Sequence, residues 1–229
     1  MIGILGGMGP YATIAFYKKV LDLTEAEKDS EHFHIWIDNN TKIPSRNRHF
    51  IFNEMSPLLG MIESINKMKL IGISNVYIPC NSASFFIQEI KKIVQDVNIV
   101  GTIDTTIYFI EKYYKNKRVM VLGAYIIFNK EPYKKGLEKV GFKYIKHDEK
   151  IQKQVEHLIY QIKTDNLSDV LIDEASLLYK NIINNYELDI LVLGCTELCI
   201  VFDKLDKTDI NIIDTNEVLA RHLVKNEKD

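Results

Sequence analysis

Short apolar runs recur along the chain, and each stops abruptly at a glycine, a proline or an acidic residue. Between them lie longer stretches with the spacing of helices. Apolar strands that alternate with helices are typical of a parallel sheet covered on both faces. The strand candidates are 2–5, 34–37, 76–78, 119–122, 190–193 and 210–213. The helix candidates are roughly 10–28, 54–70, 83–96, 104–115, 130–140, 150–163, 168–186 and 216–225. The sequence therefore predicts an α/β fold.

The strand candidates also repeat. The run that ends at Gly6 resembles the run that ends at Gly123, and the run before Cys80 resembles the run before Cys195, both about 115 residues apart. We therefore expect two similar α/β subdomains related by pseudo-twofold symmetry, each a short parallel sheet flanked by helices, with the active site in the cleft between them. The expected boundaries are 1–101 plus 210–229 for the first and 102–209 for the second. Chance resemblance is the alternative, since many α/β proteins contain apolar runs that end in glycine.

The composition of the chain argues against nucleic-acid and membrane partners. Of the 229 residues, 46% are hydrophobic and 26% are charged, and the net charge of −2 comes without a basic block that could neutralise phosphates. The first residues do not resemble a signal peptide, and no apolar run approaches the roughly 18 residues that a bilayer requires. Three cysteines do not form a disulfide framework. We expect a cytoplasmic protein with reduced thiols and no nucleic-acid or membrane partner.

Cys80 and Cys195 each follow a predicted strand and begin a strand-to-helix turn. Ligands bind at the carboxyl ends of parallel strands, and the first turn of a helix stabilises a thiolate. Packing is the default role of a free cysteine, but two at equivalent strand ends favour function. Cys199 follows one helical turn after Cys195, and we expect it to pack in the core. The chain lacks the ligand spacings of a metal site, so we expect no metal.

Three motifs carry a family resemblance. They are GGMGPYAT at 6–13, PCNSA at 79–83 and GCTEL at 194–198. In order and spacing they resemble the hallmark motifs of the aspartate/glutamate racemase family, nearest to aspartate racemases, and the match extends from residue 1 to about 222. The resemblance implies racemisation of an acidic amino acid, with aspartate preferred to glutamate, no cofactor, a small-molecule dicarboxylic amino acid as the ligand, and a homodimer.

The implied mechanism uses both cysteines. The thiolate of one removes the α-proton, and the thiol of the other returns a proton to the opposite face. Since the reverse reaction swaps the roles, the two groups must have similar acidity. Asn81, Ser82 and Thr196, with backbone N–H groups of the two turns, are expected to hold the α-carboxylate and to stabilise the transition state.

The second carboxylate of the substrate requires a cation. By the resemblance, Arg46 is the arginine that binds it, which suits a guanidinium that can bind a carboxylate with two hydrogen bonds. Lys163 matches the second cation of the family, and Met8 in the glycine-rich turn is assigned to substrate binding. For a lone arginine or lysine, a solvated surface charge is the alternative.

The chain departs from the family pattern at three positions. Ser84 stands where the family usually has histidine, which puts any role of that imidazole in doubt. Ala124 and Ile127 replace two threonines of the second half, so substrate preference or rate can differ from the family norm. Glu197 is retained, but the sequence assigns it no role beyond a hydrogen bond near Cys195.

Other functions remain open. A glutamate, broad-specificity or hydantoin racemase, or a maleate-type isomerase, would share the layout. A catalytically silent protein that binds acidic ligands is possible given Ser84, Ala124 and Ile127, although binding alone needs neither Cys80 nor Cys195. A thiol redox protein would use Cys195 and Cys199, but these lack the Cys-x-x-Cys spacing.

Overall fold

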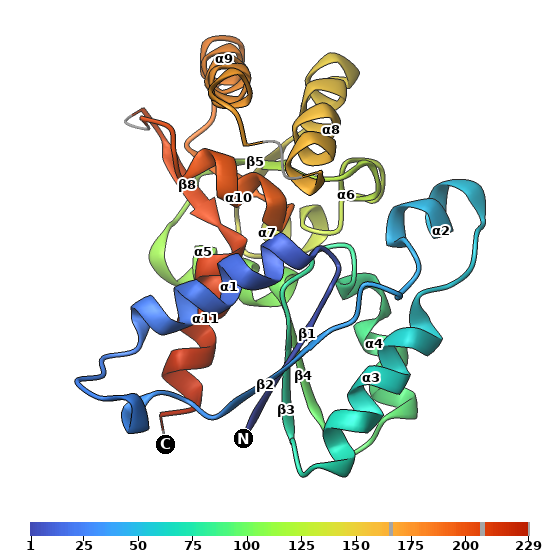
Figure 1. The fold of residues 1–229 in the computed structure, drawn as a ribbon. Coiled ribbons are helices and arrows are strands. Elements are labelled where there is room, and N and C mark those ends of the chain that lie inside the picture. The colour runs from blue at the N-terminus through green and yellow to red at the C-terminus, as the bar shows by residue number, and fades with distance from the viewer. Residues whose placement is uncertain (165–166, 207–208, 229) are drawn as a thin grey trace. The chain divides into compact units, whose positions relative to one another are not determined.

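A computed structural model describes residues 1–164, 167–206 and 209–228 (Figure 1). The strands are β1 (Ile2–Gly6), β2 (Ile35–Asn39), β3 (Asn75–Ile78), β4 (Asn98–Gly101), β5 (Arg118–Leu122), β6 (Lys143–Ile145), β7 (Ile190–Leu193) and β8 (Asn211–Asp214). The helices are α1 (Pro10–Leu23), α2 (Arg46–Phe52), α3 (Leu58–Leu70), α4 (Ser84–Ile93), α5 (Thr102–Tyr113), α6 (Tyr125–Lys130), α7 (Lys134–Lys139), α8 (Glu149–Lys163), α9 (Asp169–Asn185), α10 (Thr196–Phe202) and α11 (Thr215–Asn226), with a 3-10 turn at Asp29–Glu31.

The chain forms two compact units. Unit 1 contains Met1–Thr105 and the chain from Asn216 onward, and unit 2 contains Thr106–Thr215. Each unit holds a four-stranded sheet, and neighbouring strands among the described residues are all parallel. The expected α/β fold with a short parallel sheet in each half is therefore confirmed. None of the described helices is long and apolar enough to cross a membrane.

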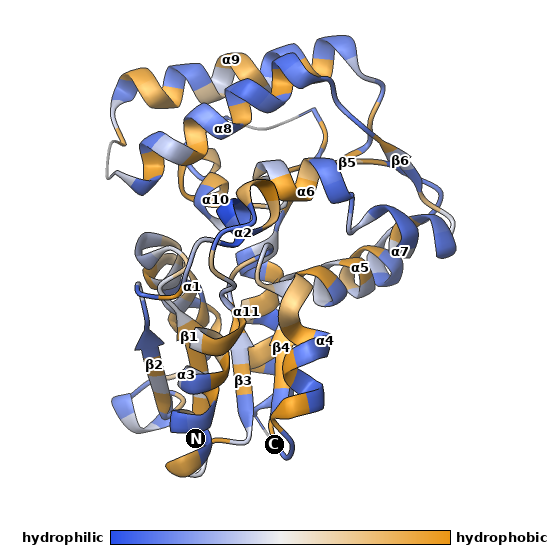
Figure 2. Cartoon of the chain, turned by 90° about the vertical axis from the view of Figure 1, so that its right-hand side faces the viewer, coloured by the Kyte–Doolittle hydropathy of each residue, from blue (hydrophilic) through white to orange (hydrophobic). Residues whose placement is uncertain are grey.

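In unit 1 the strand order is β2-β1-β3-β4. Helices cover both faces of this sheet, α3 and α4 on one and α1 with α11 on the other (Figure 1). Alternate residues of one strand enter different cores: Leu5 packs under α3 and α4, whereas Ile4 packs under α1 and α11. Burial on both faces explains why β1 is apolar throughout. At the sheet edge, β2 ends in the hydrophilic pair Asp38 and Asn39 (Figure 2).

In unit 2 the order β6-β5-β7-β8 repeats that of unit 1. Its main core is formed by β5 and β7 with α8, α9 and α10. The central strands β5 and β7 correspond to β1 and β3, so Cys80 and Cys195 follow strands at the same place in their own sheets. This correspondence is the internal repeat that the sequence indicated.

The expected boundary is wrong where the chain returns from unit 2 to unit 1. Residues 210–229 were assigned together to the first half, but β8 pairs with β7, with Ile213 opposite Val192. Only α11 belongs to unit 1. The physical reason is that the outer edge of β7 would otherwise present unpaired N–H and C=O groups. The first crossing lies at Thr105, inside α5, rather than at residue 101.

Several helices differ from the sequence expectation. The helix expected at 130–140 is the shorter α7, and α6 before it was not expected. The two are separate because α6 ends where Glu131 takes a left-handed conformation with φ of 46°. The helix expected from 54 begins only after Pro57. The short helix α2 and the edge strands β4 and β6 were not expected at all.

Candidate active site

Cys80 lies at the carboxyl end of β3, in a tight turn that precedes α4. Its thiol is buried, and its N–H donates to the carbonyl of Ile78 at 2.8 Å. The sulfur Sγ lies 3.5 Å from the carbonyl oxygen of Met8, which follows β1. Parallel pairing of β1 with β3 brings these two strand ends together. The thiol therefore faces the glycine-rich turn.

That turn has a backbone shape that needs glycine. Gly7 has φ of +82°, and a Cβ built on it would lie 2.3 Å from the carbonyl carbon of Asn40. Thr13 fixes the turn from α1, since its hydroxyl accepts from the N–H of Gly7 at 3.0 Å and donates to the carbonyl of Gly9 at 2.8 Å. This arrangement aims the carbonyl of Met8 toward Cys80. The side chain of Met8 is itself buried in the core.

Arg46 is the first residue of α2, whose N-cap Ser45 accepts from the N–H of Arg48 at 3.3 Å. The guanidinium of Arg46 donates from Nη2 to the carbonyl of Met8 at 2.9 Å and from Nη1 to the carbonyl of Pro44 at 3.1 Å. Within unit 1 the Met8 carbonyl is thus the common partner of Arg46 and Cys80. Each Nη keeps a second hydrogen, which is available to a carboxylate.

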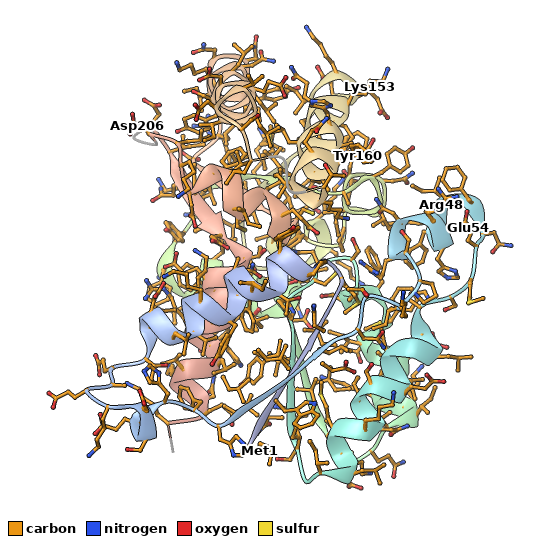
Figure 3. All side chains as sticks on the ribbon, in the orientation of Figure 1. Met1, Arg48, Glu54, Lys153, Tyr160 and Asp206 are labelled. Atoms are coloured by element: carbon orange, nitrogen blue, oxygen red, sulfur yellow. The ribbon has the colours of Figure 1, made fainter. Side chains whose placement is uncertain are left out.

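The next arginine along α2 has a different environment. Arg48 is exposed and pairs with Glu54 in the loop after α2, with Nε 2.7 Å from Oε2 and a second contact through Nη2 (Figure 3). Arg48 is therefore engaged at the surface, whereas Arg46 points to the strand ends.

In unit 2, Cys195 is the N-cap of α10 and is buried. Its Sγ donates to Oε2 of Glu197 at 3.0 Å. The other oxygen of Glu197, Oε1, lies 3.7 Å from Nζ of Lys163, the last residue of α8. The structure thus links two predicted site residues, Cys195 and Lys163, through Glu197, for which the sequence predicted only a hydrogen bond near Cys195. An acidic residue two positions after the cysteine was the only signal.

The remaining predicted residues flank the two cysteines. Asn81 is buried in the turn after Cys80, and its carbonyl accepts from the N–H of Ser84 at 3.1 Å. Ser82 is partly buried in the same turn. Thr196, next to Cys195, is 1% exposed.

The structure shows the surroundings of the three residues that depart from the family pattern. The Oγ of Ser84 is buried, with no hydrogen-bond partner among the described residues. Ala124 is the N-cap of α6, and Ile127 is buried in that helix. Apolar groups therefore stand where the family has hydroxyls.

Cys199 is part of the apolar core of unit 2 and is 1% exposed. Its Sγ lies 3.9 Å from the carbonyl oxygen of Cys195. Over 1–164, 167–206 and 209–228, no group of three or more His, Cys, Asp or Glu could hold a metal ion.

A family model described as Asp/Glu/hydantoin racemase matches residues 5–223. The chain belongs to this family. The broad specificity amino-acid racemase RacX of Bacillus subtilis is 30% identical over 228 residues, 98% of this chain and 96% of that protein. A glutamate racemase of Persephonella marina is 27% identical over 171 residues, 73% of this chain and 64% of that protein. Among solved structures, the aspartate racemase of Picrophilus torridus has a TM-score of 0.84 at 28% identity, covering 98% of this chain and 92% of that one.

Membership of the Asp/Glu/hydantoin racemase family makes the chain an amino-acid racemase. Each unit supplies this racemase with a buried thiol at the carboxyl end of a central strand and with a nearby cation. A thiol exchanges protons readily near neutral pH, and a cation orients an acidic ligand. Groups of this kind suit proton transfer to and from the α-carbon of an amino acid.

Proposed function

We propose that this racemase interconverts L- and D-aspartate by a two-base mechanism, with Cys80 and Cys195 as the two acid–base groups and without pyridoxal phosphate. The observation that carries the proposal is the equivalence of the two thiols, since each follows the corresponding strand of two sheets with the same order. Racemisation takes a proton from one face of the α-carbon and adds one to the other, so two like groups suit it.

The proposed steps balance as follows. The thiolate of one cysteine takes the α-proton, forming S–H, while the electron pair of the C–H bond stays on the α-carbon. The thiol of the other cysteine then gives its proton to the opposite face and becomes a thiolate. The mechanism requires that both sulfurs reach the same α-carbon. We assign binding of the α-carboxylate to Asn81, Ser82 and Thr196. Negative charge develops beside this group when the α-proton has been removed, and hydrogen-bond donors stabilise it.

Two cations favour an acidic substrate. Arg46 already uses one hydrogen of each Nη on a backbone carbonyl, which holds the guanidinium in place for a carboxylate. We assign it to the side-chain carboxylate of aspartate, together with Lys163. The resemblance to the aspartate racemase of Picrophilus torridus supports this choice of substrate.

A broader substrate range is the second candidate. It is favoured by the 30% identity to RacX of Bacillus subtilis, which is named for broad specificity. Ala124 and Ile127 lack the two hydroxyls of the family, so substrates whose side chains form no hydrogen bonds there are also compatible. In that case Arg46 and Lys163 would not discriminate strongly against neutral substrates.

Proton NMR in deuterium oxide tests both candidates. The purified protein is incubated with L-aspartate, L-glutamate and a panel of neutral and basic L-amino acids, with no added cofactor, and the D-enantiomer is measured by chiral chromatography. Loss of the α-proton signal with formation of D-aspartate at the highest rate supports the proposal. Similar rates across the panel favour the broad racemase, and no exchange with any substrate contradicts both.

The two cysteines are tested in the same assay. Cys80→Ser and Cys195→Ser should each abolish racemisation, because a serine hydroxyl is far too weak an acid to replace the thiol. Cys199→Ser is the matched control and should retain activity, since Cys199 belongs to the core. Near wild-type activity in either of the first two variants contradicts the two-base mechanism.

A further inference from the structure

Glu197 is a buried acid that the mechanism above does not use. Only 3% of its side chain is exposed. Carboxylates are almost never buried to this extent unless they are paired, because burial costs the charge its hydration. The partners of its two oxygens therefore indicate what the residue does.

The two oxygens face groups of opposite character. Oε2 accepts the hydrogen bond of the Cys195 thiol at 3.0 Å. Oε1 lies 3.7 Å from the ammonium of Lys163, with no hydrogen-bond partner among the described residues. At that separation the contact with Lys163 is mainly electrostatic. Glu197 thus connects a reacting thiol on one side to a half-exposed cation on the other.

This arrangement decides where the shared proton lies. A thiol is in general a weaker acid than a carboxylic acid, so a proton shared between the two rests on the sulfur. A carboxylate at hydrogen-bond distance also opposes the loss of that proton, because a thiolate would be a second negative charge beside it. The ammonium of Lys163 places a positive charge 3.7 Å from the other oxygen of the same carboxylate.

We propose that Glu197 is a positioning residue that holds Cys195 in its thiol form, so that Cys195 is the proton donor of the resting enzyme. The catalytic meaning of this inference rests on the proposed two-base function. Lys163 offsets the charge of Glu197. It thereby makes the Cys195 thiolate easier to form when Cys195 acts as the base in the reverse direction. The pair therefore tunes one of the two thiols.

Steady-state rates cannot identify the resting donor. Two enantiomers have the same free energy in water, so kcat/KM must be equal in the two directions for the wild type and for every variant. The proton has to be observed on the sulfur itself. Alkylation provides this measurement, because only the thiolate reacts.

The test uses the whole 229-residue chain without substrate. Iodoacetamide modification of Cys195 is followed by mass spectrometry against pH, in the wild type, in Glu197→Gln and in the control Glu174→Gln. Glu174 is a half-exposed carboxylate of the same unit, paired with His157. The Cys80 peptide of each digest serves as an internal reference. The midpoint of the profile reports the proton affinity of Cys195, and the plateau reports its accessibility.

Glu197→Gln should lower the midpoint for Cys195 by about one unit or more, since the amide keeps an acceptor but removes the charge. At a pH below both midpoints this is an increase in rate of about tenfold or more. Glu174→Gln should leave the midpoint unchanged. An unchanged or higher midpoint in Glu197→Gln would overturn the proposal.

Lys163→Gln gives a result of opposite sign. Without the ammonium the charge of Glu197 is uncompensated, and the Cys195 midpoint should rise. A midpoint that falls in both variants would show that the substitutions merely loosen the site, and would also overturn the proposal. Because alkylation needs no substrate, these results stand apart from the NMR assay, which can fail without affecting them.

Discussion

Arg46 is held at the strand ends by two backbone carbonyls, whereas Arg48 on the same helix is paired with Glu54 at the surface. Arg46→Ala should raise the KM for aspartate by on the order of 10- to 100-fold, because hydrogen bonds to a charged carboxylate are lost. Arg48→Ala is the control and should leave KM within a few-fold. Steady-state kinetics checks both. An unchanged KM in Arg46→Ala would place the side-chain carboxylate elsewhere.

Gly7 and Gly72 share a left-handed backbone and differ in their surroundings. Their φ angles are +82° and +84°, but a Cβ on Gly72 would meet nothing within 4 Å, whereas one on Gly7 would overlap the backbone of Asn40. Gly72→Ala should cost about 1–2 kcal/mol of unfolding free energy from the conformation alone. Gly7→Ala should cost clearly more, because the overlap adds to it. Denaturant unfolding measures both, and equal losses would show that the turn adapts without strain.

His147 in unit 2 makes stability depend on pH. Burial lowers its pKa, against the opposing effect of the Asp148 carbonyl 3.1 Å from Nδ1. The folded state therefore binds the proton less tightly than the unfolded state does. The contribution to stability is complete above the unfolded pKa of about 6.5 and is lost as pH falls through the lower folded pKa.

His147→Asn should reduce the loss of unfolding free energy between about pH 7.5 and about pH 5.5. Comparing the two pH values cancels the stacking on Phe128 that the substitution also removes. The exposed His34 provides the control, and His34→Asn should preserve the wild-type difference. The same acid-induced loss in His147→Asn as in the wild type would assign it to other groups.

At the scale of the elements, α11 is fixed to the sheet of unit 1 by polar and apolar contacts. The chain just after the helix places Glu227 against β3, where Oε1 accepts from the hydroxyl of Tyr77 at 2.9 Å and Oε2 from Nδ2 of Asn75 at 3.3 Å. Tyr77 is 1% exposed, and burial, with Glu227 next, raises its pKa. The hydroxyl is therefore a fixed donor.

Tyr77→Phe should lower the unfolding free energy by about 1–3 kcal/mol, because it leaves a partly buried carboxylate without its main donor. Glu227→Gln in a double-mutant cycle should show a coupling of at least about 0.5 kcal/mol. Tyr108→Phe, at a tyrosine that is 58% exposed, should stay within about 0.5 kcal/mol of the wild type. Additive losses in the cycle would show that the two side chains act independently.

Among the strands, those with a continuous apolar run were the most predictable. The central strands β1, β3, β5 and β7 are buried on both faces and were predicted within two residues. The missed strands β4 and β6 lie at sheet edges, and β6 has only three residues. Edge position alone does not explain the two misses, since the edge strands β2 and β8 were predicted.

In the candidate site too, some features were predictable from the local sequence and others were not. The cysteines could be found because a strand end is encoded locally. The link from Lys163 to Glu197 and the Met8 carbonyl shared by Arg46 and Cys80 join residues more than thirty positions apart in the chain. Such contacts depend on how the elements pack, and no local pattern encodes them.

At the scale of the whole molecule, each unit has its own apolar cores. Leu223 of α11 and Ile182 of α9 are both fully buried, one in each unit. Either residue replaced by alanine should cost about 2–5 kcal/mol. Hydrogen exchange should then quicken in β1 for Leu223→Ala and in β7 for Ile182→Ala. Equal acceleration of both strands in both variants would show that the chain unfolds as a single cooperative body.

Unit 1 is built from both ends of the chain, and this has a consequence during synthesis. The first strand and first helix leave the ribosome early, but the apolar face they share with α11 stays open until α11 emerges. All of residues 106–215 must be translated in between, which takes on the order of ten seconds at roughly 5–20 residues per second. Throughout that interval the nascent chain carries an incomplete first unit. Premature termination before α11 would leave that unit permanently unfinished, exposed to chaperones and proteases.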